Sequence, residues 1–176
     1  MEPISSAFET LAEIAGALLG FGAIAFALAR GPEDLVPEDR IRLFLLLSLA
    51  VASIMGGILP HVLVSLGQTG ASLWRTWSFA YVFMGTQIII IWALLYSQMD
   101  SPEKAAYLGR TRLFRVQSIV VHGILATSFV AQIFNFLAIG LPGREWVCLA
   151  GLLFTVIQAA IILLTIIFLR PQRSGE

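Results

Sequence analysis

The sequence predicts an all-α integral membrane protein, with five transmembrane helices in one polytopic domain that covers residues 1–176. Five apolar stretches are each long enough to cross a hydrocarbon core of roughly 30 Å, which takes about 20 helical residues. They cover about residues 8–29, 41–66, 73–97, 113–139 and 146–169. Hydrophobic residues make up 58% of the chain and charged residues only 12%, whereas a soluble domain carries about 25% charged residues. The chain is therefore expected to be almost entirely membrane helix.

The first stretch, 8–29, is expected to stay in the protein as a membrane helix. The N-terminal region carries no Lys or Arg and holds Glu2, Glu9 and Glu13 instead. A cleaved signal peptide would begin with a positively charged region. The Gly31-Pro32 pair follows the stretch and is expected to end the helix.

Residues that start and stop helices mark the boundaries of the other four stretches. Pro37 precedes the acidic pair Glu38 and Asp39, which is typical of the first turn of a helix. The run Ser101-Pro102-Glu103 resembles a helix start and predicts a short extra helix before the fourth stretch. Short turns are expected before the third stretch at Gly67 and Gly70, and before the fifth at Gly140, Pro142 and Gly143.

The positive charges predict the orientation of the helices in the membrane. Nine of them fall on one side, in alternate connecting segments: Arg30, Arg40, Arg42, Lys104, Arg110, Arg112, Arg115, Arg170 and Arg173. The other side has only Arg75 and Arg144. Since segments rich in Lys and Arg stay in the cytoplasm, the N-terminus is expected outside and the C-terminus inside.

Two hairpins in the chain carry similar sequence features. The tripeptide Arg-Leu-Phe occurs at 42–44 and again at 112–114, and Gln87 and Gln158 each precede an Ile-rich segment. Matching features lie 70 to 73 residues apart, so the second and third helices are expected to be related to the fourth and fifth by duplication. Both copies would run in the same direction, so an axis along the membrane normal would relate them. Chance matching in a Leu-rich chain is the alternative.

Polar side chains within the apolar stretches are the candidate site residues, because polar groups in a membrane usually face the interior of the bundle. The candidates are Glu13, His61, Gln132, Asn135, Gln87, Gln158 and His122. At 1.5 Å per residue, the first four lie about 7–12 Å from the outer boundary. Gln87 and Gln158 lie near the midplane, and His122 lies about 10 Å from the inner face. Glu13 and His61, on adjacent helices, are expected to pair.

Helical periodicity predicts which face of three helices packs inside the bundle. On the first helix the predicted packing stripe is Glu9, Glu13, Gly16, Gly20 and Ala27. On the fourth it is Gln117, Ser118, His122, Ser128, Gln132 and Asn135, and on the fifth it is Cys148, Gly151, Thr155, Gln158 and Thr165.

The sequence favours neither an enzyme nor a metal or cofactor protein. All three aspartates lie in connecting segments, and the chain has no G-x-S-x-G or H-E-x-x-H motif. His61 and His122 would differ in depth by about 11 Å, too far for both to bind one haem iron. The lone cysteine, Cys148, excludes an internal disulfide, and a net charge of zero provides no basic face for nucleic acid.

Three interpretations of the polar residues remain open. They are hydrogen bonds between helices, a path or binding site for protons, ions or a small polar solute, and a metal or cofactor site. We expect a small permease, a channel, or a subunit of one; the alternative is a scaffold or assembly partner that transports nothing. Membrane lipids, a second copy and another membrane protein are the expected partners. The chain resembles small multi-pass proteins of the bacterial inner membrane, which predicts that location and implies no activity.

Overall fold

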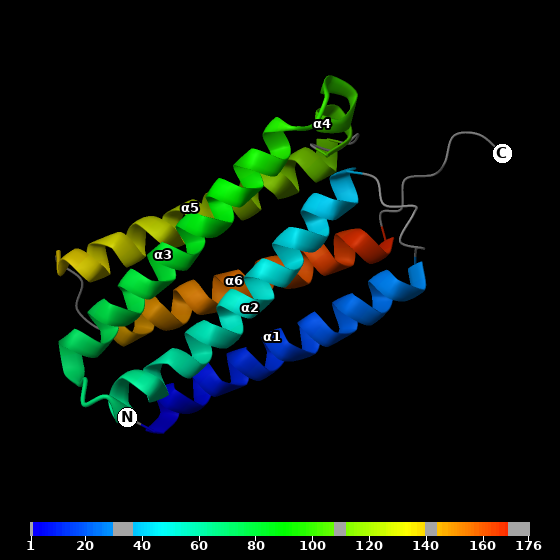
Figure 1. Ribbon diagram of the computed structural model, residues 1–176. Helices are drawn as coiled ribbons and strands as arrows, with labels where there is room; N and C mark the ends of the chain where they lie inside the picture. Colours follow the sequence, from blue (N-terminus) through cyan, green and yellow to red (C-terminus); the bar gives the residue numbers. More distant parts are fainter. Residues whose placement is uncertain (1, 30–36, 108–111, 140–143, 169–176) are drawn as a thin grey trace.

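The computed structural model describes residues 2–29, 37–107, 112–139 and 144–168, and all regular secondary structure in these residues is α-helical (Figure 1). The helices are α1 (Glu2–Ala29), α2 (Pro37–Ser65), α3 (Gly70–Ser97), α4 (Ser101–Tyr107), α5 (Arg112–Leu137) and α6 (Arg144–Phe168). The five long helices match the five apolar stretches, and α4 is the short extra helix expected from the sequence.

Four of the long helices are long and apolar enough to cross a membrane. Their apolar segments are Ser6–Ile24, Arg40–Ser65, Gly70–Ser97 and Arg144–Ile167. The fifth long helix, α5, contains a shorter apolar segment, His122–Leu137. The expectation of an all-helical protein is therefore confirmed for the described residues, and four of its helices could span a membrane. The count of five spans stays a prediction.

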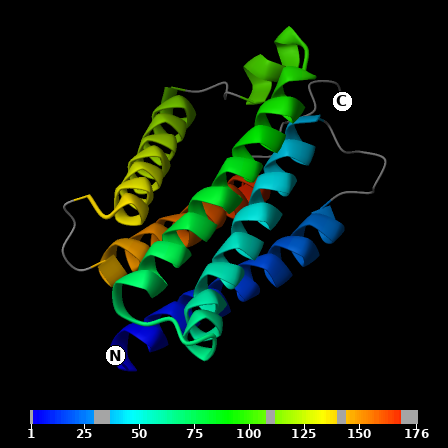
Figure 2. The same ribbon diagram turned by 60° about the vertical axis from the view of Figure 1, so that its left-hand side comes forward.

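The helices form one bundle with α1 and α5 on opposite sides (Figures 1 and 2). Helix α1 packs against α2 and α6, whereas α5 packs against α3 and α6. Helices α2 and α6 also contact each other and form the middle of the bundle. The N-terminus lies near the turn between α2 and α3, and α4 lies at the opposite end (Figure 1).

Local sequence explains where α3 and α4 begin. Gly67 and Gly70 adopt φ angles of +81° and +55°, a left-handed conformation that glycine adopts without strain. Helix α4 begins at the predicted Ser101, and its start is capped by Asp100 together with Glu103 of the predicted run. The Glu103 amide donates to Asp100 Oδ1, and the Asp100 amide donates to Glu103 Oε2, each at 2.9 Å. This reciprocal pair satisfies two amides that the helix leaves without partners.

The face of α1 that packs in the bundle differs from the predicted stripe. Phe8, Leu11 and Ala15 are buried, while Glu9, Glu13 and Gly20 are exposed and Gly16 is half-buried; the side chain of Ala27 lies outside the described residues. Phe8 stacks on Trp74 with ring centroids 5.6 Å apart, and it meets the edge of Trp77 at 5.8 Å. Burying these large rings stabilises the bundle more than burying glycines would, so the aromatic contacts set the rotation of α1.

Close contact between α1 and α2 depends on Gly57. A Cβ atom at this position would lie 2.6 Å from Phe8 O and 2.6 Å from Ala12 Cβ. Since real Cβ atoms do not approach other atoms so closely, only glycine allows the two helices to pack at this distance. Trp77 then joins α3 to α2, because its Nε1 donates to Gly56 O at 2.7 Å.

The predicted duplication agrees with the order in which the helices neighbour one another. A twofold rotation that exchanges α2 with α5 and α3 with α6 turns the α3–α5 contact into the α2–α6 contact. The two contacts must therefore occur together, and both are present. The two matching glutamines nevertheless have different surroundings, since Gln87 is exposed and Gln158 is buried. Superposition of the two hairpins, with Gln87 on Gln158, stays a prediction.

Candidate functional site

A cluster of four neutral polar side chains joins α3, α5 and α6. We call Ser78, Gln132, Asn135 and Cys148 the polar cluster; all four are buried, with exposed fractions of 0 to 1%. Ser78 Oγ donates to Gln132 Oε1 at 2.8 Å and accepts from Asn135 Nδ2 at 2.8 Å. Asn135 Nδ2 also lies 3.3 Å from Cys148 Sγ. The sequence correctly placed Gln132 and Asn135 on an inward face of α5.

Gly151 on α6 makes room for the Gln132 side chain. A Cβ atom at residue 151 would lie 2.5 Å from Gln132 Nε2. In this position Gln132 Nε2 donates to the Val147 carbonyl at 2.7 Å. The glutamine therefore bonds to a side chain of α3 and to the backbone of α6, so one residue of α5 connects three helices.

A second set of hydrogen bonds joins α3 to α6 beside the polar cluster. Tyr81 donates to the Gly151 carbonyl at 3.0 Å, and its hydroxyl lies 2.6 Å from Thr155 Oγ1. Thr155 Oγ1 in turn donates to the same Gly151 carbonyl at 2.9 Å. The predicted inward face of α6 is confirmed, because Cys148, Gly151, Thr155, Gln158 and Thr165 are all buried.

Together, the polar cluster and the Tyr81 bonds mainly hold helices together. The cluster contains no charged residue, and its hydroxyl and amide groups bond chiefly to one another and to backbone carbonyls. Such bonds satisfy polar groups that the hydrocarbon interior would otherwise leave without partners. Among the residues that the structure describes, no three His, Cys, Asp or Glu side chains come together as metal ligands would.

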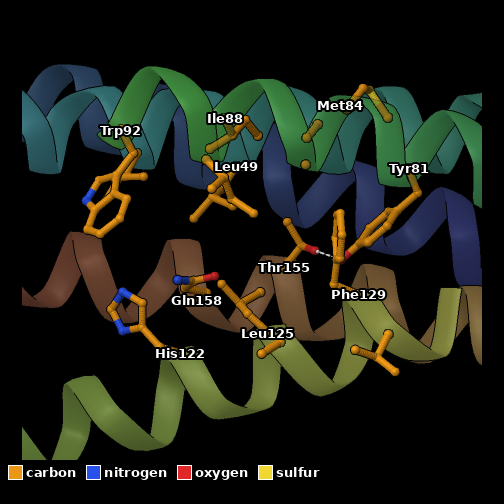
Figure 3. Close-up of a pocket in the computed structure, with 16 residues that line it drawn as sticks. Leu49, Tyr81, Met84, Ile88, Trp92, His122, Leu125, Phe129, Thr155 and Gln158 are labelled. Atoms are coloured by element: carbon orange, nitrogen blue, oxygen red, sulfur yellow. Dashed lines mark hydrogen bonds between the residues drawn. The ribbon is translucent and has the colours of Figure 1, made fainter. Parts of the chain in front are cut away.

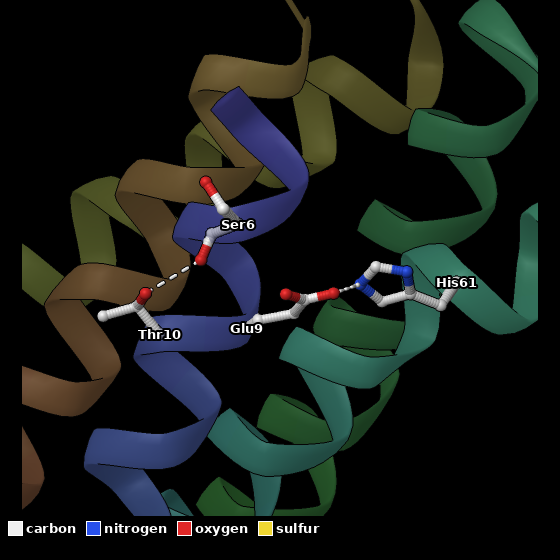
Figure 4. Close-up of polar contacts among 4 residues, drawn as sticks. All are labelled: Ser6, Glu9, Thr10 and His61. Carbon is white, nitrogen blue, oxygen red and sulfur yellow. Dashed lines mark hydrogen bonds and ion pairs between the residues drawn. The ribbon is translucent and has the colours of Figure 1, made fainter. Parts of the chain in front are cut away.

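His61 pairs with a different carboxylate from the one expected. His61 Nε2 lies 3.2 Å from Glu9 Oε1 (Figure 4), whereas Glu13 makes no hydrogen bond or ion pair with any described residue. Helices α1 and α2 run in opposite directions, and Gly57 contacts Phe8 and Ala12. His61 lies one turn further along α2, so it faces a part of α1 nearer the N-terminus, where Glu9, one turn before Glu13, is the carboxylate within reach.

The remaining candidates divide between a cavity and the surface. Gln158 and His122 line a cavity between α2, α3, α5 and α6 (Figure 3). Gln87 is exposed on α3 and does not line it. The seven predicted residues thus fall into separate groups and do not form one site. The side chains of Gln117 and Ser118 lie outside the described residues.

Sequence reasoning missed the contribution of α3. Ser78 and Tyr81 hold the centre of both hydrogen-bonded sets, yet neither was among the candidates. A signal was present in the sequence: Trp74, Trp77, Ser78 and Tyr81 repeat at intervals of three and four residues. That spacing places bulky aromatic residues and one hydroxyl on a single helix face, as expected of the face that packs inside the bundle.

Comparisons with known proteins add no functional assignment: no protein-family model, no curated protein and no solved structure matches the chain. The function must therefore be argued from the molecule's own surfaces and cavities.

Proposed function

We propose that this protein is a five-span protein of the bacterial plasma membrane that acts as an assembly partner, docking another membrane protein on the exposed face of α1. We call Glu13, Gly16, Ala17 and Gly20 the α1 face. The proposal rests on one observation: the carboxylate of Glu13 lies beside two glycines with free space around them, on a helix long enough to cross a membrane. In the described part of the chain, Glu13, Ala17 and Gly20 are exposed and Gly16 is half-buried.

The α1 face has the shape of a helix-docking surface. A Cβ atom added at Gly16 or Gly20 would meet nothing within 4 Å, and Ala17 between them is exposed. Small residues four positions apart let a second helix approach closely in a membrane. Inside the bundle, Gly57 already allows such a close contact between α1 and α2.

Glu13 indicates what the docked helix carries. It lies about two helical turns inside the apolar segment Ser6–Ile24. Its side chain is exposed and has no partner among the described residues. A carboxylate in hydrocarbon is costly unless it is paired, so we infer a partner helix with a hydrogen-bond donor or a positive charge facing Glu13. A second copy meeting on the α1 face would bring two carboxylates together.

Passage of a proton, an ion or a small polar solute is the second proposal. The cavity of about 470 Å³ between α2, α3, α5 and α6 favours it. Its lining is mostly apolar, however, and Gln132 and Asn135 are tied into the polar cluster instead of lining it. These features support the assembly role over the transport of polar solutes.

Photo-crosslinking in native membranes tests the assembly role. A photoreactive residue at Ala17 should crosslink to another polypeptide, whereas the same residue at Ala93, exposed on α3, should not. Gly16→Ile should reduce the Ala17 crosslink at least severalfold, because it fills the α1 face. Gly123→Ile is the matched control, since Gly123 on α5 also has nothing within 4 Å.

Three outcomes would contradict the assembly role. They are crosslinks to lipid alone, crosslinks only between copies of this chain, and an Ala17 crosslink that Gly16→Ile does not weaken. Proton or ion flux through liposomes containing the pure protein would instead support the transport role.

A further inference from the structure

The cavity between α2, α3, α5 and α6 has the size and lining of a binding site for an apolar molecule. Its volume is about 470 Å³, within the roughly 300–1,000 Å³ range of small-molecule pockets. Most of its walls are aliphatic or aromatic, including Leu49, Ile88 and Phe129. In Figure 3, His122 and Trp92 lie at one end, and Tyr81 and Thr155 lie toward the other.

The cavity lies beside a part of α5 whose described side chains are exposed. The residues of α5 whose side chains are described and buried are Ser128, Gln132 and Asn135, all in its C-terminal half. Nearer the N-terminus, His122 and Ala126 line the cavity and are exposed, as is Ile89 opposite them on α3. The cavity therefore opens on the side of the bundle between α3 and α5, where a molecule from the bilayer can enter.

Gln158 has a hydrogen-bond acceptor beside this apolar cavity that no donor meets. Its side chain is 5% exposed, and Oε1 is buried with no hydrogen-bond partner in the described structure. By contrast, the hydroxyl of Tyr81, another wall residue, is already bonded to Gly151 and Thr155. An amide oxygen left unbonded in such surroundings is costly. The polar wall residues Tyr81, Trp92, His122 and Thr155 do not bond to it in the described structure.

We propose that the cavity binds one apolar molecule from the bilayer that carries a hydroxyl group, and that this hydroxyl donates a hydrogen bond to Gln158 Oε1. The apolar walls bind the hydrocarbon chain, and the opening between α3 and α5 admits it. A hydroxyl matches the unmet acceptor of Gln158. An ionised head group does not, since no Lys, Arg, Asp or Glu of the described residues lines the cavity.

Farnesol and its methyl ether test this proposal, because the ether keeps the chain but cannot donate a hydrogen bond. Binding of each to the full chain in nanodiscs would be measured by native mass spectrometry. Farnesol should bind roughly fivefold more tightly than the ether, as expected for one net hydrogen bond.

Gln158→Leu should remove that difference by weakening the binding of farnesol alone. Ala126→Trp should abolish binding of both, and Ala93→Trp, exposed on α3 outside the cavity, should change neither.

Several results would overturn the proposal. They are no binding of farnesol to the unaltered chain, equal binding of alcohol and ether, and binding that survives Ala126→Trp. If Gln158→Leu does not fold, the comparison of the two ligands on the unaltered chain still decides whether a donor is recognised. Loss of the Ala17 crosslink would not affect these results, because the α1 face lies on another helix.

Discussion

Gln132 shows how a buried polar side chain in this bundle forms its hydrogen bonds with other helices. Gln132 accepts from Ser78 on α3 and donates to the Val147 carbonyl on α6. Glutamine is long enough to reach both, and Gly151 leaves it the space. Gln87, on the exposed side of α3, has the same side chain but no such role. Tertiary position, rather than residue type, decides what a polar side chain does here.

Replacing these two glutamines by leucine should have unequal effects on stability. Gln132→Leu leaves the Ser78 hydroxyl without its acceptor and Val147 without its side-chain donor, and should lower the free energy of unfolding by roughly 1–3 kcal/mol. Gln87→Leu exposes an apolar side chain where lipid is expected and should not lower it. Thermal unfolding of both variants in the same detergent measures the difference. Equal unfolding temperatures would mean that the polar cluster does not stabilise the bundle.

At the scale of helices, close approach is controlled by a few glycines. Gly57 allows α2 to contact the Phe8 carbonyl and Ala12 of α1, while Gly123 on α5 faces open space. The register that Gly57 sets also determines that His61 pairs with Glu9. A glycine that only lowers helix propensity can thus be distinguished from one that sets helix packing.

Alanine substitutions should separate these two kinds of glycine. In Gly57→Ala the added Cβ would lie 2.6 Å from two atoms of α1. The helices must move apart, which should cost roughly 1–3 kcal/mol of unfolding free energy. Gly123→Ala adds a methyl group in open space and should keep or raise stability, since alanine favours helix over glycine by about 1 kcal/mol. Thermal unfolding would contradict this account if Gly57→Ala were as stable as Gly123→Ala.

For the whole molecule, the distribution of charge predicts how the bundle sits in the membrane. The N-terminus and the α2–α3 turn lie at one end of the bundle, and α4, which carries Lys104, lies at the other (Figure 1). In the sequence, nine of the eleven basic residues fall in or next to the segments that connect the long helices on the Lys104 side. The positive-inside rule therefore predicts that α4 lies on the cytoplasmic side.

Cysteine labelling in intact cells tests this orientation. A membrane-impermeant thiol reagent should label Thr69→Cys and Gly143→Cys, and it should label Lys104→Cys and Gln172→Cys only after the cells are opened. The native Cys148 is buried, so the unaltered chain serves as the unlabelled control. Labelling of Lys104→Cys in intact cells would reverse the assignment. Residues 143 and 172 lie outside the described structure, and their prediction rests on the sequence alone.

The sequence by itself determined the features that depend on local composition and on the solvent. Long apolar runs, helix-stopping glycines and prolines, and an acidic helix start predicted the helices, the short α4 and the inward face of α6. These signals suffice because a chain in hydrocarbon must satisfy its backbone within each helix.

Only the tertiary structure decided how the helices rotate and align. The α1 face points outward because Phe8 packs on Trp74 and Trp77 from a distant part of the chain. His61 selects Glu9 because contact at Gly57 sets the register. The cavity beside Gln158 lies where the described part of α5 is exposed at His122 and Ala126, whereas Ser128, Gln132 and Asn135 are buried. Each outcome depends on side chains from two or more helices fitting together, and helical periodicity within one segment does not contain that information.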